Sequence, residues 1–191
     1  ISSYRIDIGC QSCRCGRSRT KRNIQEVDRR RRQKCIRYRY IPNTYEVYWN
    51  ISADKLWERM KREYDAFWTE GRLKKASDLH LSPVEVSILA SIVEEETAVS
   101  DEYPVVAGLY INRLLKGMPL QADPTVKYAV GDFTLKRILN KHLAVESPYN
   151  TYLHEGLPPG PIRFPSMKGI NAVLNYTRHN YLYMCAKEDF S

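Results

Sequence analysis

The chain has 191 residues and 43% hydrophobic content, which suits one domain, or one domain with an appendage, and is enough to build a core. No apolar run approaches the roughly 18 residues of a membrane span, and the first residues lack the pattern of a signal peptide. The net charge of +8 comes from residues 1–40, which hold 13 basic and 3 acidic residues, against 17 and 19 in the remainder. The remainder is therefore nearly neutral, which argues against a nucleic-acid partner.

The opening segment, residues 1–40, is rich in Cys and Arg, and we expect it to be disordered or not native to the domain that follows. It holds four of the five cysteines: Cys10, Cys13, Cys15 and Cys35. Their spacing is poor for a zinc finger and no His lies nearby, so a metal site is disfavoured. The arginine run 29–32 could bind phosphates, but a solvated run is favoured. The composition changes abruptly at residue 41, where we place the start of a second domain, residues 41–191.

Residues 45–49 alternate and are rich in strand-forming side chains, which predicts a short strand. Ser52 is a plausible N-cap of a helix that should run to about Glu70. Another helix should start at Pro83, because Ser82 can cap it and Glu85 completes a capping box.

Three consecutive glutamates, Glu94, Glu95 and Glu96, end this third element. At about 100° per residue, Glu96 falls near the centre of its apolar arc, Glu95 falls at the edge, and Glu94 points well away. The arc is formed by Ile88, Leu89, Ile92 and Val93. Burial would raise the pKa of Glu96 and keep it protonated near neutral pH, as a general acid requires. The alternative is a structural Glu that pairs with an Arg or Lys, or that reaches solvent at the helix end.

A further helix should begin at Pro104 and end at Gly117. Asp123, followed by Pro and Thr, predicts a turn and a cap, and residues 134–143 form a short amphipathic pattern. The segment 149–162 is a long loop with four prolines or glycines in a row, and its aromatic and aliphatic residues favour an ordered, functional loop.

Ser166 should cap the last helix. Residues 181–186 read as a buried strand, and Cys185 within it as a small buried hydrophobe.

Five stretches, in order, carry a resemblance to a known family: Ser-Ile-Val-Glu-Glu-Glu-Thr at 91–97, Ile-Asn-Arg-Leu at 111–114, Gly-Met-Pro-Leu-Gln-Ala-Asp-Pro-Thr-Val at 117–126, Tyr-Asn-Thr-Tyr at 149–152 and Gly-Leu-Pro-Pro-Gly-Pro-Ile at 156–162. With them, residues 41–191 resemble the MltG (YceG-like) family of endolytic murein transglycosylases. The resemblance implies an α+β fold with helices packed on a small mixed β-sheet. Family members usually begin with a membrane-spanning helix and a LysM-like module and continue past the last strand. We therefore expect a catalytic domain truncated at both ends.

For activity, the resemblance implies a lyase that cleaves the β-1,4 bond between N-acetylmuramic acid and N-acetylglucosamine within glycan strands and leaves a 1,6-anhydro-muramic end. The family's catalytic Glu falls on Glu96, which alone would act as acid and then as base. No cofactor is implied, and no metal site is evident from residue 41 on. A second carboxylate would be optional, with Asp123 and Glu94 as candidates, although a capping role for Asp123 is as reasonable.

Sugar binding needs aromatic faces together with amides and hydroxyls. The segments that the resemblance places near the cleft supply this mixture through Gln121, Asp123, Thr125, Tyr149, Asn150, Thr151 and Tyr152. Asn150 and Thr151 could instead brace the loop, and Tyr152 could belong to the core. Arg113 could pair with a carboxylate of the peptide stem, but an internal pair with a Glu is favoured.

The implied partners are peptidoglycan glycan strands and the cell-wall synthesis machinery. The implied location is the periplasm, or extracytoplasmic face of the bacterial cytoplasmic membrane, with membrane contact only through an anchor in a longer parent protein. A non-catalytic glycan-binding module is the main alternative. A pyridoxal phosphate enzyme of the aminodeoxychorismate lyase type is disfavoured because no Gly-rich phosphate loop appears. Nucleic-acid binding would depend on residues 1–40 alone.

Overall fold

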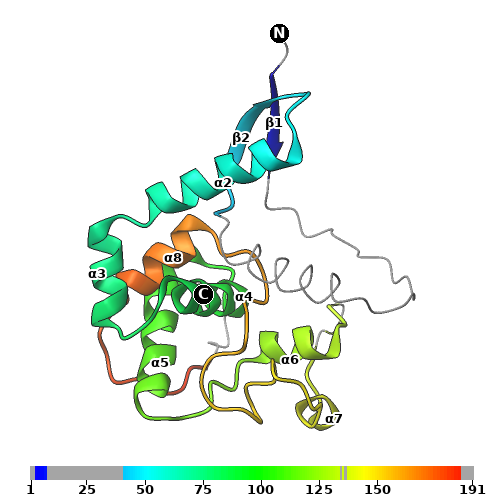
Figure 1. Cartoon of the computed structure of the whole chain (residues 1–191). Helices are drawn as coiled ribbons and strands as arrows, with labels where there is room; N and C mark the ends of the chain where they lie inside the picture. Colours follow the sequence, from blue (N-terminus) through cyan, green and yellow to red (C-terminus); the bar gives the residue numbers. More distant parts are fainter. Residues whose placement is uncertain (1–2, 8–40, 134, 136, 186–191) are drawn as a thin grey trace, which may run out of the picture. The chain divides into compact units, whose positions relative to one another are not determined.

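The computed structural model describes residues 3–7, 41–133, 135 and 137–185, and the chain forms two compact units (Figure 1). Unit 1 comprises residues 1–84 and unit 2 residues 85–191. The four cysteines and the arginine run of the opening segment lie outside the described residues, so the predictions for them, and the boundary at residue 41, stay predictions. Five residues of that segment do form a strand, which the sequence did not lead us to expect.

Unit 1 contains a small antiparallel sheet. Strand β1 (Ser3–Asp7) pairs with β2 (Thr44–Tyr48), so the predicted strand near residue 45 is confirmed. Tyr45 and Val47 on β2 are buried while their neighbours are exposed, which is the alternation of a sheet with one covered face. Within the described residues this two-stranded sheet replaces the mixed sheet that we predicted. The described part of the chain is rich in helix, and residues 181–185 of the second predicted strand form no strand.

Two helices follow in unit 1. Helix α2 (Ala53–Phe67) begins as predicted at Ser52, whose side chain accepts a hydrogen bond from the Lys55 backbone N at 3.4 Å. It ends before Glu70, because Thr69 has extended backbone angles and is the N-cap of a separate helix, α3 (Glu70–Asp78). Met60 of α2 packs with the buried side of β2 in a small hydrophobic cluster.

Unit 2 is helical in its described part. It contains all but the first two residues of α4 (Pro83–Glu96), the short 3-10 helix η1 (Ser100–Glu102), α5 (Tyr103–Leu115), α6 (Asp123–Val130), α7 (Asn140–Leu143) and α8 (Met167–Leu174). Figure 1 shows α5 and α8 next to α4, and α5 packs against α8. Every residue of α4 from Val86 to Glu94 is buried, so this helix is the centre of the unit's core.

Local signals fix most of these helix ends. Helix α4 starts at Pro83 as predicted, and the Ser166 side chain accepts a hydrogen bond from the Gly169 backbone N at 3.2 Å at the start of α8. Gly117 has a positive φ of 63° and follows α5, as predicted for a helix stop. Only Asn140–Leu143 of the predicted helix 134–143 is helical, and residues 134 and 136 lie outside the described part.

The predicted buried strand at 181–186 is wrong for its described residues. Residues 181–185 form no strand, and Tyr181 and Tyr183 are 62% and 69% exposed. The segment lies along a helix, because the Asn112 side chain donates to the Tyr181 carbonyl and Arg113 donates to the Leu182 carbonyl, at 3.1 and 2.7 Å. Side chains of a helix therefore donate hydrogen bonds to backbone carbonyls that, in a sheet, would accept hydrogen bonds from a neighbouring strand.

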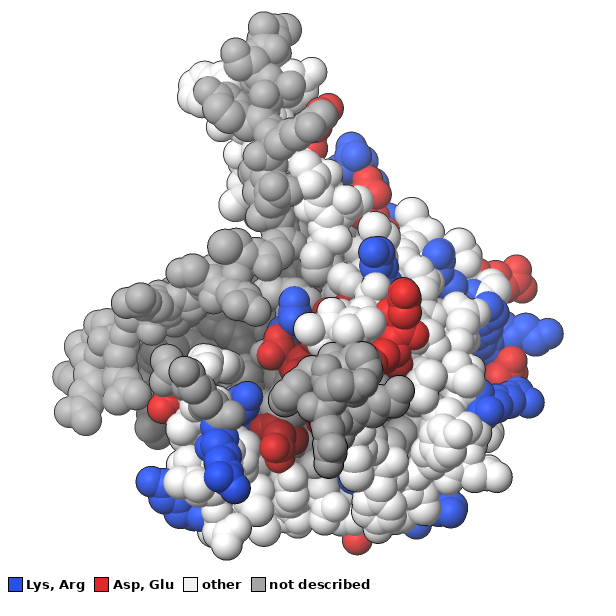
Figure 2. Space-filling model, turned by 180° about the vertical axis from the view of Figure 1, so that it is seen from behind, with Lys and Arg blue, Asp and Glu red and all other residues white. Residues whose placement is uncertain are grey.

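No single helix among the described residues has the length and apolar composition of a membrane span, although the consecutive helices α3 and α4, taken together across a bend, meet both criteria. On the face drawn in Figure 2, Lys and Arg side chains lie among Asp and Glu side chains. This mixture agrees with the nearly neutral composition of residues 41–191.

Candidate active site

Of the three glutamates at the end of α4, Glu94 has different surroundings from those that helical spacing predicted. Glu94 is buried, Glu95 is exposed and Glu96 is half-buried. The predicted orientation of Glu94 away from the core is wrong, because α4 is apolar and covered around its whole circumference rather than along one stripe.

Glu94 joins α4 to the start of α8. Its Oε1 accepts hydrogen bonds from the Ser166 backbone N, at 2.8 Å, and from the Ser166 hydroxyl, while Arg163 Nε lies 3.5 Å from Oε2. Arg163 also pairs with Glu95 at 2.8 Å. Both carboxylates therefore bind to the loop before α8, and no local pattern predicted the position of that loop.

Glu96 has one hydrogen bond from a side chain. The Tyr110 hydroxyl of α5 donates to Glu96 Oε2 at 3.0 Å. Burial raises the pKa of Glu96 as the main effect, and the negative charge of Asp123 adds to the rise. The Tyr110 hydrogen bond and the positive charges of Lys127 and Arg113 oppose it. The net rise favours a protonated carboxyl group, which is the property that the sequence predicted for Glu96.

Asp123 and Tyr152 form a second pair of a carboxylate and a phenol. The Tyr152 hydroxyl donates to Asp123 Oδ1 at 2.7 Å, and burial together with Asp123 raises the pKa of Tyr152. Asp123 is exposed in the first turn of α6, where its charge suits the helix dipole. It is not the N-cap, which is Ala122, so the predicted capping role is wrong. The negative charge of Asp123 also raises the pKa of Glu96.

A chain of hydroxyl groups supports the start of α6. The Thr125 hydroxyl donates to the Ala122 carbonyl at 2.6 Å and lies 2.8 Å from the Thr151 hydroxyl. Thr151 also accepts from the Ala122 backbone N and, through its carbonyl, from the Gln121 backbone N, both at 3.0 Å. Thr125 and Thr151 are buried, whereas Gln121 is exposed with a positive φ of 49°.

Asn150 braces the loop that contains it. Its buried side chain donates to the Leu143 and Val145 carbonyls at 2.8 and 2.9 Å and accepts from the Tyr152 backbone N at 3.0 Å. The amide is thus used inside the loop, as one of the two predicted alternatives requires. Direct contact of Asn150 with a sugar stays a prediction.

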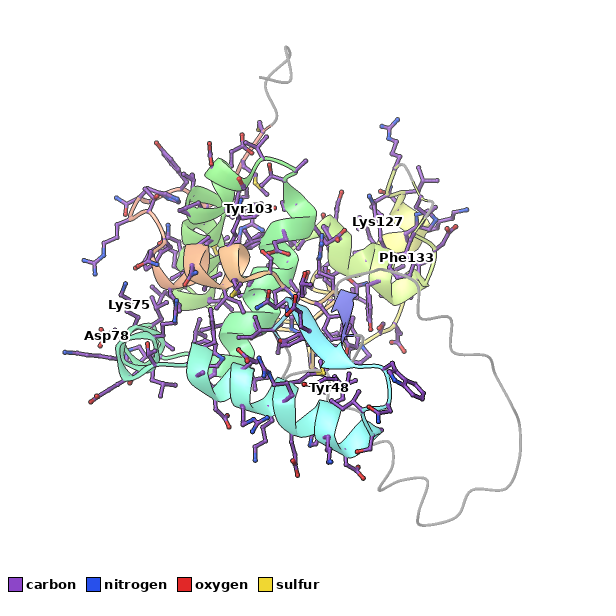
Figure 3. The ribbon with its side chains drawn as sticks, turned by 90° about the horizontal axis from the view of Figure 1, so that it is seen from above. Tyr48, Lys75, Asp78, Tyr103, Lys127 and Phe133 are labelled. Atoms are coloured by element: carbon purple, nitrogen blue, oxygen red, sulfur yellow. The ribbon has the colours of Figure 1, made fainter. Side chains whose placement is uncertain are left out.

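Aromatic rings cluster beside the end of α6. The Tyr149 ring lies 4.7 Å from the Tyr128 ring, which lies 6.2 Å from the Phe133 ring. Phe133 is 71% exposed. Figure 3 labels Phe133 and Lys127 on this side of the unit, and Tyr103 at the start of α5. The half-buried Tyr149 therefore belongs to an aromatic surface of the kind that can stack on a sugar ring.

Arg113 does not form the predicted ion pair with any carboxylate among the described residues. Its guanidinium donates to the Leu182 and Leu120 carbonyls at 2.7 and 2.6 Å, and it lies 5.2 Å above the Tyr183 ring. Backbone carbonyls that meet at this buried position supply the acceptors instead. Cys185, predicted to be buried, is exposed because its segment is not a core strand.

Tyr110 was not among the site residues predicted from the sequence. A tyrosine at an apolar helical position gives no signal of a polar partner, and its contact with Glu96 joins two helices. No group of three His, Cys, Asp or Glu side chains within the described ranges could hold a metal ion.

Comparison with known proteins places these features in a family. A profile of the YceG-like family matches residues 14–191. The endolytic murein transglycosylase of Bacillus subtilis (strain 168) is 45% identical over 101 residues, which cover 53% of this chain and 28% of that protein. The endolytic murein transglycosylase of Streptococcus pneumoniae serotype 2 (strain D39) is 31% identical over 150 residues, covering 76% of this chain and 27% of that protein.

A solved structure is also similar. The crystal structure of a yceG-like protein from Listeria monocytogenes aligns with a TM-score of 0.67 and 34% identity, covering 79% of this chain and 49% of that one. The chain thus spans under a third of the curated relatives that it matches and about half of the solved structure.

Proposed function

Because the chain belongs to the YceG-like family, we propose that it is the catalytic part of an endolytic murein transglycosylase, with Glu96 as its single acid and base. The observation that carries this proposal is the environment of Glu96. Burial raises its pKa, and a tyrosine hydroxyl binds one of its oxygens. A carboxyl group whose pKa is raised keeps its proton to higher pH than an ordinary Glu, which favours a role as a general acid.

The proposed reaction needs no water. Protonated Glu96 gives its proton to the bridging oxygen as the bond between that oxygen and the anomeric carbon of N-acetylmuramic acid breaks. The carboxylate then takes the proton of the muramic 6-hydroxyl while O6 bonds to the same carbon. The products are a shortened strand with a 1,6-anhydro-muramic end and a free N-acetylglucosamine 4-hydroxyl, and Glu96 is protonated again.

The seven substrate-binding residues divide by exposure. Gln121 and Asp123 are exposed, and Tyr149 and Tyr152 are half-buried, so we propose that these four contact the glycan. Thr125, Asn150 and Thr151 are buried and bonded within the fold, so we propose that they hold the first group in place. Asp123 would also keep Glu96 protonated through its charge.

The substrate would be peptidoglycan, which is the murein of the relatives' names. Peptidoglycan lies outside the cytoplasmic membrane, so the proposed activity requires an extracytoplasmic location. Membrane anchoring through a longer parent protein, and contact with the cell-wall synthesis machinery, are parts of the same proposal.

The test is digestion of purified peptidoglycan followed by mass spectrometry of the products. The wild-type chain should release internal 1,6-anhydro-muramic products, and Glu96→Gln should release none. Glu95→Gln is the matched control, because it removes the adjacent carboxylate of the same helix from an exposed position. It should keep the activity.

Other outcomes would contradict the proposal in distinct ways. Products with reducing ends would mean a hydrolase that uses water and a second carboxylate. Absence of products from the wild type, with retained binding to insoluble peptidoglycan, would mean a non-catalytic glycan-binding module.

A further inference from the structure

Tyr110 is a buried tyrosine whose hydroxyl group binds an acidic side chain. The residue is 1% exposed, and its hydroxyl donates to Glu96 Oε2 at 3.0 Å. Buried phenols usually find a hydrogen-bond partner; Tyr45, the other tyrosine that is buried among the residues with described burial, donates to the Ile41 carbonyl at 2.7 Å. Tyr110 differs because its partner is the group on which the proposed chemistry depends.

The helix that carries Tyr110 is held near both of its ends. Near its start, the Thr177 backbone N donates to the Pro104 carbonyl at 2.9 Å. Near its end, Arg113 donates to the Leu120 and Leu182 carbonyls. A side chain on a helix fixed in this way is well suited to orient another group.

The hydrogen bond distinguishes the two oxygens of Glu96. Oε2 accepts from the phenol, and no donor to Oε1 is present in the described part of the chain. The terminal torsion of a Glu side chain is soft, so an unbound carboxyl group would rotate and exchange its oxygens. The phenol opposes this rotation and leaves Oε1 to carry the proton.

Tyr110 keeps its own proton while Glu96 changes charge. Burial and the adjacent Glu96 both raise the pKa of Tyr110 above its usual alkaline value, so its hydroxyl remains a hydrogen-bond donor near neutral pH. Its hydrogen bond lowers the pKa of Glu96, against the larger effect of burial, because a donor favours the charged carboxylate.

We infer that Tyr110 is the positioning residue of Glu96: its hydroxyl holds the carboxyl group with Oε1 as the proton-carrying atom and stabilises the carboxylate formed after proton donation. The kinetic part of this inference rests on the proposed function. The contact itself can be tested without turnover.

The experiment replaces the hydroxyl alone, with Tyr110→Phe. The chain carries ¹³C-labelled glutamate, and NMR follows the titration of the Glu96 carboxyl signal, identified by its loss in Glu96→Gln. The titration midpoint should move to higher pH, and kcat should fall about tenfold, the effect of one lost hydrogen bond to a charged group. KM should change little, and the pH profile of kcat should shift in the same direction. Tyr45→Phe is the matched control, since it removes a buried phenol of unit 1, and should leave the midpoint unchanged.

The outcomes are separable. An unmoved Glu96 midpoint in Tyr110→Phe overturns the inference. If the Glu96 midpoint moves in Tyr110→Phe but the wild-type chain makes no anhydro products, the inference about the contact holds and the proposed function is refuted. If Tyr110→Phe does not fold, 3,5-difluorotyrosine at position 110 tests the same contact, because a more acidic phenol donates more strongly. That chain should titrate Glu96 at lower pH, and no change would again overturn the inference.

Discussion

The buried hydrogen bonds between Glu94 and Ser166 at the start of α8 lead to a prediction about the free energy of unfolding. Glu94 has a side chain that is 3% exposed, and its Oε1 accepts two hydrogen bonds from Ser166. Arg163 Nε lies 3.5 Å from Oε2, but the Arg163 side chain is 35% exposed. If Glu94 were removed, water could therefore replace part of the attraction to Arg163. Hydrogen bonds to a charged group are each worth about 1.5 kcal/mol or more. We expect Glu94→Ala to lower the free energy of unfolding by about 3 kcal/mol.

The isosteric change separates the hydrogen bonds from the charge. Glu94→Gln keeps an oxygen for Ser166 but loses the charge that strengthens these hydrogen bonds and attracts the partly exposed Arg163, so we expect a smaller loss than for Glu94→Ala, of about 1–2 kcal/mol. The exposed pair of Glu95 with Arg163 should be worth less than about 0.5 kcal/mol.

Urea denaturation followed by circular dichroism measures these differences. Fluorescence is less suitable, because all three tryptophans, at 49, 57 and 68, lie in unit 1. The expected order of destabilisation is Glu94→Ala, then Glu94→Gln, then Glu95→Ala. If Glu94→Ala cost no more than Glu95→Ala, the argument from burial would be refuted.

Two further predictions concern the surroundings of Glu94 and Glu96. A Cβ at Gly169 would clash with Glu94 Oε1, so Gly169→Ala should destabilise the chain by about 1–3 kcal/mol in the same denaturation assay. Gly71→Ala, which has nothing within 4 Å, is the control and should be neutral or stabilising. Burial raises the pKa of Glu96, so the native fold prefers the protonated form of this residue. The contribution of Glu96 to the free energy of unfolding is therefore fully present below the ordinary Glu pKa and is lost as the pH rises through the pKa that Glu96 has in the native state. The free energy of unfolding of Glu96→Gln should therefore equal that of the wild type in acid and exceed it as the pH rises towards 8. Equal free energies of unfolding across that range would contradict the burial of Glu96.

The sequence was most informative where a single residue type determines local backbone geometry. Ser52 and Ser166 mark helix starts because a side-chain oxygen satisfies a free N–H at the first turn. Pro83 fits the first turn, and Gly117 adopts the left-handed conformation after a helix. Each signal acts within a few residues, so each could be predicted without knowledge of the fold.

Contacts between distant segments could not be predicted in this way. Residues 181–185 have the composition of a strand, but whether a strand forms depends on its neighbour, and here the neighbours are Asn112 and Arg113 of a helix. Strand β1 is the reverse case, because its pairing with β2 joins segments about 40 residues apart without any local pattern. The Tyr110 contact with Glu96 is of the same kind.

The end of α4 illustrates why spacing alone is a weak guide to chemistry. Glu94, Glu95 and Glu96 share one residue type and one turn, and helical geometry ranks them only if the helix has a single covered face. Because α4 is covered all round, the most buried carboxylate is Glu94, and it is bound by Ser166 and Arg163. In the proposed function, proton transfer belongs to Glu96, which is half-buried and whose one side-chain donor among the described residues is the neutral Tyr110 hydroxyl. Helical spacing selected the same residue, but on the premise of a one-sided stripe that the structure does not have. What distinguishes Glu96 is the set of partners that tertiary packing gives to each carboxylate.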